Sequence, residues 1–281
     1  MEFTSEEGEQ RYAVLVRAAA EAVVGLDFDG TLAPIVEDPE AAHIHPEAGG
    51  VLEALAAQVL AVAVVAGRPA RQALDLGGLE QVGNAIGDAG KELYLFGQYG
   101  NERWSSTNRR VISPMPPHGL ASFTADLPRL LRRYGAEKAH IEEKGLAVAV
   151  HTRRLPDPAS TYDSLLPALR EQAARHDLVV EPGKQVIEIR SPGVHKGIVV
   201  ETLVEELQAG GFVFVGDDLG DVEAFEAVAA LAKSGMPTLL VCSASDEESA
   251  LVARSDVLVN GPEGVLALLR QLTADAAALR A

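Results

Sequence analysis

The sequence predicts an α/β protein with a Rossmann-like core built on a parallel sheet and a second, inserted α+β domain. Over roughly the first hundred residues, short apolar runs alternate with helical patterns, as in βαβ units. This alternation stops near Asn108 and resumes after Pro192. A parallel pattern that is interrupted once indicates an insertion. We therefore expect a core formed by residues 1–108 and 192–281, and an inserted domain at residues 109–191.

The core elements follow from short apolar runs of strand length and from helical patterns between them. Pro46 precedes the first predicted helix, where proline is favourable. The predicted core strands lie at residues 22–28, 60–66, 81–86, 212–215, 238–242 and 257–259. The predicted core helices lie at residues 47–58, 196–208 and 222–234, with a last helix from Val265.

The inserted domain begins where Pro114, Pro116 and Pro117 break the chain, and a basic helical stretch follows. Further elements are expected as strands at residues 146–152, 178–180 and 186–189 and as a helix at 158–176. These short strands with helices between them predict a small α+β unit.

Composition excludes several classes of protein. The 281 residues carry a net charge of −17, which argues against nucleic acid or an anionic membrane as a partner. No apolar stretch reaches the length of about 18 residues that a membrane span needs. The acidic N-terminus lacks the pattern of a signal peptide. The single cysteine, Cys242, is expected to be a buried structural thiol, which fits a reducing cytoplasm. We expect a cytoplasmic monomer.

The most informative motif is the pair Asp27 and Asp29, at the end of the first predicted strand and before Gly30. Open α/β sheets bind ligands at the carboxyl ends of their strands. Two close carboxylates repel each other, and an all-oxygen site on a turn suits Mg²⁺. A solvated turn is the plain alternative. An EF-hand is a weaker one, because Gly30 is fourth in the motif instead of sixth and a strand leads into it.

Three further segments carry candidate chemistry, each at a strand end or a helix start. Residues 66–69 form a glycine turn that could offer backbone N–H groups to an anion. Lys196 opens a helix, and residues 216–221 contain Asp217, Asp218 and Asp221. Singly, each fits a solvated charge or a loop brace. Together, carboxylates at two strand ends, a glycine turn and a lysine predict a metal-assisted phosphoryl-transfer site.

These motifs resemble those of the haloacid dehalogenase superfamily of phosphatases, and residues 27–31 (Asp-Phe-Asp-Gly-Thr) match its first motif in full. The resemblance implies that Asp27 is a nucleophile that becomes an aspartyl phosphate. It implies that Asp29 protonates the leaving alcohol and that Lys196 steadies the phosphate. The implied Mg²⁺ site comprises Asp27, the backbone carbonyl of Asp29, and Asp217, with Asp218 and Asp221 as additional acids. From the glycine turn itself, Gly67 and Arg68 are candidate substrate contacts, and Arg68 fits a loop brace equally well.

A closer likeness, to the trehalose-phosphate phosphatase family, covers nearly the whole chain. It includes Gly-Asn-Glu-Arg at residues 100–103 and cap segments at residues 141–145, 150–153 and 181–184. The likeness implies hydrolysis of trehalose 6-phosphate, with the inserted domain as a cap. The implied sugar contacts are Glu142, Lys144, Glu181 and Lys184. From the residues alone, such mixed charges also fit a solvated sheet face. His43, His45 and His151 have no partner spacing and are interpreted as structural or exposed, and Trp104 is expected near the hinge.

The chain departs from the family pattern at Ala66, where a Ser or Thr hydroxyl is usual, and at Gly220 and Val222, which replace Thr and Glu. One hydrogen bond to a charged group contributes roughly 1.5 to 3 kcal/mol. Its loss could slow turnover by one to two orders of magnitude unless the Gly67 N–H or a water compensates. Two alternatives stay open. One is a phosphatase for sucrose phosphate or a glycosyl-glycerate phosphate. The other is a non-catalytic protein that binds sugar phosphate, which Ala66 favours.

Overall fold

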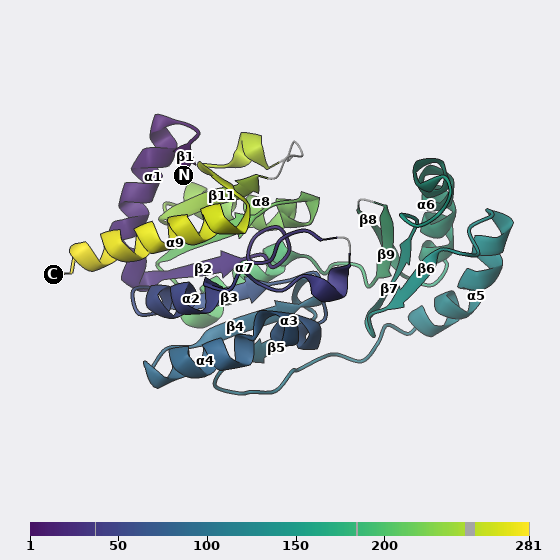
Figure 1. The fold of residues 1–281 in the computed structure, drawn as a ribbon, viewed down its shortest axis with the longest axis horizontal. Coiled ribbons are helices and arrows are strands. Elements are labelled where there is room, and N and C mark those ends of the chain that lie inside the picture. Colours follow the sequence, from purple (N-terminus) through teal and green to yellow (C-terminus); the bar gives the residue numbers. More distant parts are fainter. Residues whose placement is uncertain (37, 184, 245–250, 281) are drawn as a thin grey trace. The chain divides into compact units, whose positions relative to one another are not determined.

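A computed structural model describes residues 1–36, 38–183, 185–244 and 251–280. The chain forms two compact units, Met1–Ser113 with His195–Ala281 as the core and Pro114–Val194 as the inserted unit (Figure 1). The predicted fold class is confirmed: a mainly parallel sheet with helices forms the core, and a second, antiparallel sheet forms the insertion.

The core sheet has parallel strands at its centre and an antiparallel strand at each edge. Strand β2 (Ala22–Leu26) lies between β10 (Gly211–Gly216) and β3 (Ala61–Val65), and both neighbours run parallel to it. The carboxyl ends of these three strands therefore meet at one sheet edge, where open α/β folds bind ligands. The full order is β1 (Glu2–Phe3), β12 (Val257–Asn260), β11 (Thr238–Ala244), β10, β2, β3, β4 (Leu93–Gly97) and β5 (Glu102–Ser105).

Helices cover both faces of this sheet, so its central strands are buried on both sides. Along β2, Val24 packs into one cluster and Val23 into the other, because successive side chains point to opposite faces. The first face is covered by α1 (Glu6–Arg17), α2 (Ala48–Ala56), α3 (Ala70–Gly77), α4 (Leu79–Asp88) and α9 (Gly261–Ala278). The second face is covered by α7 (Lys196–Leu207) and α8 (Val222–Lys233).

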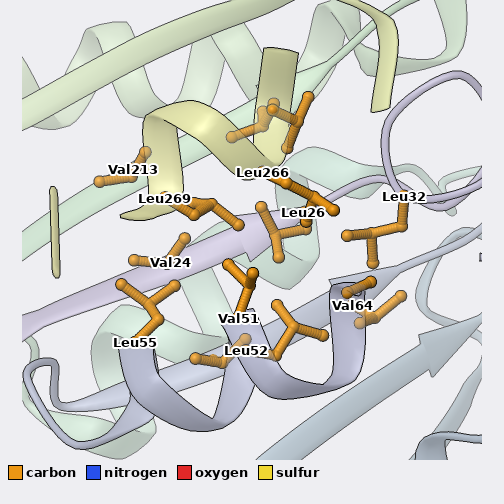
Figure 2. Close-up of a cluster of buried hydrophobic side chains, with 14 of the residues drawn as sticks. Val24, Leu26, Leu32, Val51, Leu52, Leu55, Val64, Val213, Leu266 and Leu269 are labelled. Carbon is orange, nitrogen blue, oxygen red and sulfur yellow. The ribbon is translucent and has the colours of Figure 1, made fainter. Parts of the chain in front are cut away.

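Figure 2 shows how apolar side chains pack on the first face of the sheet. Side chains of α2 and α9 meet those of β2 in one apolar cluster, and Leu32, from the turn after β2, joins it. Leu26 and Leu32 are both fully buried. Burying a leucine side chain contributes about 1.5 to 3 kcal/mol. The two leucines therefore anchor both ends of the segment that carries Asp27 and Asp29.

One predicted strand is wrong. Residues 81–86 belong to helix α4, and the third parallel strand is β4, seven residues further on. The buried residues of α4 are Leu79, Gly83 and Ile86, a spacing of four and three that matches one helical face. Short apolar runs do not distinguish a strand from a buried helix segment. The helix begins after Gly78, which adopts a left-handed conformation with φ 54°.

The inserted unit is an antiparallel sheet with helices on one face. Its strand order is β6 (His140–Glu143), β7 (Ala147–His151), β9 (Val186–Arg190) and β8 (Val179–Gly183). Helices α5 (Leu120–Arg133) and α6 (Pro158–Ala174) pack on apolar side chains such as Val148, Ile187 and Ile189. Alternate residues therefore place the polar side chains on the other face of the sheet.

Three smaller expectations have clear outcomes. Cys242 is buried in β11, as predicted. Trp104, expected near the hinge, packs in the core cluster of the first sheet face, close to Gly83 of α4. Its neighbour Arg103 pairs with Ile112, next to the boundary of the two units at Ser113. Among the described residues, no helix combines the length and the apolar character that crossing a membrane requires.

Candidate active site

The first motif continues directly from β2. The backbone N–H of Asp27 donates to the Val215 carbonyl at 2.9 Å, which extends the pairing with β10 by one residue. The chain then turns at Gly30, whose φ is +73° and whose carbonyl accepts from Ser243 Oγ at 2.6 Å. A Cβ atom at Gly30 would lie 2.0 Å from Asp217 Oδ2. Glycine is therefore required here both by conformation and by the close approach of Asp217.

Lys196 joins the first motif to the acidic loop. Its Nζ, at the first residue of α7, donates to Asp27 Oδ1 and, at 2.7 Å, to Asp221 Oδ1. Asp27, Lys196 and Asp221 are 4%, 3% and 0% exposed. Burial by itself lowers the pKa of Lys196, but the nearby carboxylates of Asp221 and Asp27 outweigh it and the net pKa is raised. Lys196 therefore stays a cation beside Asp27.

Asp221 organises the loop after β10. Its Oδ2 accepts the backbone N–H of Asp217 at 3.0 Å and, more weakly, that of Asp218 at 3.4 Å. Asp218 Oδ1 in turn accepts the N–H of Gly220 at 2.8 Å, which forms a capping box at the short helix that follows. Both oxygens of Asp221 are thus engaged by the protein. This positions the Asp217 side chain at the sheet edge.

The carboxylates fit a divalent cation. Oxygen atoms of Asp27, Asp217 and Asp221 lie within 4.8 Å of one another. Without a cation, burial, followed by the charges of Asp218 and Asp221, raises the pKa of Asp217 to about 8. Burial also raises the pKa of Asp27, with further contributions from Asp221 and Asp217. Such repulsion is what a bound cation relieves, and an all-oxygen donor set suits a hard ion.

Arg68 holds Asp29 with two hydrogen bonds. Its Nε donates to Asp29 Oδ2 at 2.7 Å and its Nη2 to Oδ1 at 2.6 Å, while Nη1 donates to the Pro39 carbonyl at 2.7 Å. The guanidinium carbon lies 5.6 Å from the centre of the Phe28 ring. Arg68 was predicted as a candidate substrate contact. In this state it fixes the orientation of Asp29, and its contact with a substrate stays a prediction.

The loop after β3, which carries Ala66 and Gly67, is held by a turn that the sequence analysis missed. In the turn η3 (Gln98–Gly100), Gln98 N donates to the Arg68 carbonyl at 2.8 Å and Tyr99 N to the Ala66 carbonyl at 3.0 Å. Glu102 Oε2 then accepts the N–H of Ala70, at the start of α3, at 2.6 Å. Correct placement of β4 would have located this turn at a strand end, beside the other motifs.

The predicted sugar contacts lie on the polar face of the inserted sheet. Glu142 and Glu181 occupy one cross-strand row with Ala149 and Glu188 between them. Lys144 Nζ donates to Glu188 Oε2 at 2.6 Å, and Arg190 Nη2 donates to Glu181 Oε2 at 2.6 Å. Lys184 lies outside the described residues. The sequence analysis did not single out Glu188 and Arg190, although their alternation with Ile187 and Ile189 would have marked them as one face.

The three histidines interpreted as structural or exposed each make a hydrogen bond. His151, for which the sequence spacing gave no partner, places Nε2 2.9 Å from Glu142 Oε2. This hydrogen bond is the largest cause of a lowered Glu142 pKa, against the opposing effect of burial. Outside this face, His43 Nδ1 lies 3.2 Å from the Leu76 carbonyl and His45 Nδ1 accepts the Glu47 N–H. Their structural interpretation therefore fits.

Comparison with known proteins identifies relatives of this arrangement. The family described as Trehalose-phosphatase matches residues 25–259. An uncharacterized glycosyl hydrolase of Mycobacterium tuberculosis (strain ATCC 25618 / H37Rv) is 36% identical over 217 residues, 73% of this chain and 15% of that protein. A trehalose-phosphate phosphatase of Mycolicibacterium paratuberculosis (strain ATCC BAA-968 / K-10) is 32% identical over 226 residues, 77% of this chain and 54% of that protein. The chain thus spans about half the length, or less, of these relatives.

A solved structure agrees on the fold. The C-terminal domain of C. albicans trehalose-6-phosphate phosphatase has a TM-score of 0.76 at 20% identity, covering 97% of this chain and 98% of that one. At 20% identity this likeness shows the fold alone. The chemistry of the site is argued from the residues described above.

Proposed function

Because the chain belongs to the trehalose-phosphatase family, we propose that it is a Mg²⁺-dependent phosphatase that hydrolyses trehalose 6-phosphate to trehalose and phosphate. One observation supports the chemistry above all. Asp27, Lys196 and Asp217 come from distant parts of the chain, yet Lys196 Nζ contacts Asp27 and shares Asp221 with the Asp217 backbone. These are a nucleophile, a cation for the phosphoryl group and a metal ligand in one buried site.

In the first step, an oxygen of Asp27 attacks phosphorus, and the bond between phosphorus and the sugar oxygen breaks. The sugar oxygen leaves with a proton from Asp29, and Asp27 becomes an aspartyl phosphate. In the second step, Asp29 takes a proton from a water molecule that attacks the same phosphorus, which releases phosphate and restores Asp27. Lys196 orients Asp27 and reduces the negative charge around the transferring group.

Arg68 sets the starting geometry of Asp29. Both Asp29 oxygens accept from the guanidinium, which holds the carboxyl group at two points. Reorienting the carboxyl group toward a leaving oxygen breaks at least one of these hydrogen bonds. The Asp29 side chain is 39% exposed, against 11% for Arg68, so Asp29 is the partner with room to turn. We assign Arg68 to the positioning of the acid and base.

The metal would be held by side-chain oxygens of Asp27 and Asp217 and by the backbone carbonyl of Asp29. When bound, Mg²⁺ neutralises negative charge on the phosphoryl group. Asp221 holds Lys196 and the loop that carries Asp217 in place, since its oxygens accept from Lys196 and from the loop backbone. Asp218 caps the loop.

Sugar recognition is assigned to the polar face of the inserted unit. Glu142, Lys144 and Glu181 present charged hydrogen-bonding groups, which are the stronger kind for a polyhydroxyl ligand. Glu188 and Arg190 hold Lys144 and Glu181 by ion pairs of 2.6 Å. Donors and acceptors are thereby fixed before a ligand arrives.

A phosphate-release assay over a panel of sugar phosphates, with Mg²⁺ and with EDTA, tests the proposal. We expect Mg²⁺-dependent release with the highest kcat/KM for trehalose 6-phosphate and none from the Asp27→Asn variant. Preference for sucrose phosphate or a glycosyl-glycerate phosphate would replace the substrate but keep the chemistry. Binding without release on any substrate would replace the enzyme with a sugar-phosphate-binding protein.

A further inference from the structure

Position 66, in the glycine loop after β3, supplies no donor for a phosphoryl group. Ala66 has no side-chain hydroxyl, and its backbone N–H donates to the Phe96 carbonyl at 2.8 Å. The Arg68 guanidinium donates to Asp29 and to the Pro39 carbonyl. A phosphoryl group on the Asp27 side of this loop carries about two negative charges, and removing such a group from water requires hydrogen-bond donors.

Tyr99 places a hydroxyl over this loop. Its Oη and Cζ atoms both lie 3.0 Å from the position that a Cβ atom on Gly67 would occupy. On the other side, its Cε1 atom lies 3.7 Å from the corresponding position on Gly220, in the loop after β10. The ring therefore lies between the two glycine loops that follow the strands on either side of β2. Its hydroxyl lies over Gly67, the residue that follows Ala66 in the chain.

The backbone at Tyr99 has an uncommon conformation. Tyr99 has φ 61° and Gln98 has φ 48°, two successive non-glycine residues in the left-handed region. Each such residue costs about 1 to 2 kcal/mol. The turn is kept in place by the hydrogen bonds from Gln98 N to the Arg68 carbonyl and from Tyr99 N to the Ala66 carbonyl. Backbone strain that the surroundings enforce in this way is typical of functional sites.

We propose that the Tyr99 hydroxyl donates a hydrogen bond to the phosphoryl group and supplies the donor that Ala66 lacks. A phenol O–H and a serine O–H have the same donor capacity. A phenol ring reaches the group from the turn after β4, whereas a serine would reach it from position 66 itself. This inference rests on the proposed phosphoryl chemistry and deepens it, since it assigns a phosphate-contacting residue to the same site.

A double-mutant cycle between positions 66 and 99 tests the proposal in the full chain. Tyr99→Phe removes the hydroxyl and keeps the ring, and Ala66→Ser adds a hydroxyl at the glycine loop. The first readout is the Kd of inorganic phosphate in the presence of Mg²⁺, measured by calorimetry. The second is kcat/KM for p-nitrophenyl phosphate, whose leaving group makes no sugar contacts. Thermal melts check that each variant folds.

We expect Tyr99→Phe to weaken phosphate binding and kcat/KM about tenfold or more, as for a lost hydrogen bond to a charged group. Adding Ala66→Ser to it should restore both to within about threefold, while Ala66→Ser alone should change either by less than about threefold. If Tyr99→Phe stays within twofold of the parent, or if Ala66→Ser fails to repair its loss, the proposal is overturned. A gain of tenfold or more from Ala66→Ser alone also overturns it.

These outcomes are separate from those of the proposed function. If the parent binds inorganic phosphate but releases none from any sugar phosphate, the phosphatase proposal fails while the binding cycle still decides the role of Tyr99. If the parent hydrolyses trehalose 6-phosphate and Tyr99→Phe has no effect on either readout, only the role of Tyr99 is lost.

Discussion

Replacing Gly30 by alanine should abolish metal binding although no carboxylate residue is replaced. A Cβ atom there would lie 2.0 Å from Asp217 Oδ2 and 2.3 Å from its Cγ. An ordinary non-bonded contact is about 3.5 Å, so the carboxylate must withdraw by roughly 1 Å or more. Mg²⁺ requires ligands at about 2.0 to 2.1 Å in near-octahedral geometry. A shift of that size therefore takes Asp217 out of the coordination set.

Gly90→Ala is the matched control. Gly90 has φ +74°, almost equal to the +73° of Gly30, but its Cβ position has no atom within 4 Å. Both variants should lose about 1 to 2 kcal/mol of stability from the left-handed backbone. Only Gly30→Ala should also lose Asp217 as a metal ligand.

Thermal and calorimetric titrations with Mg²⁺ separate the two effects. At an Mg²⁺ concentration 100 times the parent Kd, the parent and Gly90→Ala should both gain about 2.7 kcal/mol of stability. If Gly30→Ala loses 100-fold in affinity, its gain at the same concentration falls to about 0.4 kcal/mol. Phosphate release should fall in parallel. If Gly30→Ala binds Mg²⁺ and turns over as Gly90→Ala does, the assignment of Asp217 as a metal ligand is refuted.

Three further predictions follow from the same contacts. The pKa of Asp217 is raised to about 8 in the folded protein, whereas it is near 4 in the unfolded chain. The protonated Asp217 carboxyl group therefore contributes fully to the free energy of unfolding below about pH 4, and this contribution is lost as the pH rises through about 8. Urea unfolding in EDTA should therefore show the metal-free protein weakening over this window, and Asp217→Asn should flatten the trend; an unchanged slope would contradict the cause given. Arg68→Lys removes the double hold on Asp29 and should lower kcat about tenfold while leaving the Kd for Mg²⁺ unchanged; a kcat equal to that of the parent would refute the positioning role. Lys144→Met leaves the buried Glu188 without its 2.6 Å partner and should destabilise the protein by about 3 kcal/mol in denaturant titrations, whereas Arg175→Met, at an exposed pair, should cost less than about 1 kcal/mol. Equal losses in these two variants would argue against a preformed sugar face.

The core of the site could be predicted because its chemistry is local in sequence. Asp27, Asp29 and Asp217 each follow an apolar strand directly, and parallel strands bring such ends to one edge. The hydrogen bonds within the site could not be predicted from the sequence. Nothing in the sequence distinguishes Asp221, which accepts from Lys196 and the loop backbone, from Asp218, which caps a short helix. Those roles depend on which carboxylate faces inward.

The part of the site that was missed depends on a single misplaced strand. Assigning residues 81–86 to the sheet concealed β4, and with it the turn that carries Tyr99. The segment at residues 100–103 was named, but not the hydrogen bond by which Glu102 accepts from Ala70 N. The apolar residues of α4 are few and close together, so their period was ambiguous. In the inserted unit, Glu188 was missed for a different reason. It is a buried charge whose partner, Lys144, is 44 residues away in the chain.

The central claim is that Asp27 carries the phosphoryl group between two steps at this site. The most direct test is to mix the Asp29→Asn variant, which lacks the base of the second step, with ³²P-labelled p-nitrophenyl phosphate and Mg²⁺, and to quench it in acid. The leaving group of this substrate needs no proton from Asp29, so only the second step is slowed. We predict a hydroxylamine-sensitive label on the peptide that contains Asp27, and none when Asp27→Asn is added. Label on another peptide, or label that survives the loss of Asp27, would contradict the account.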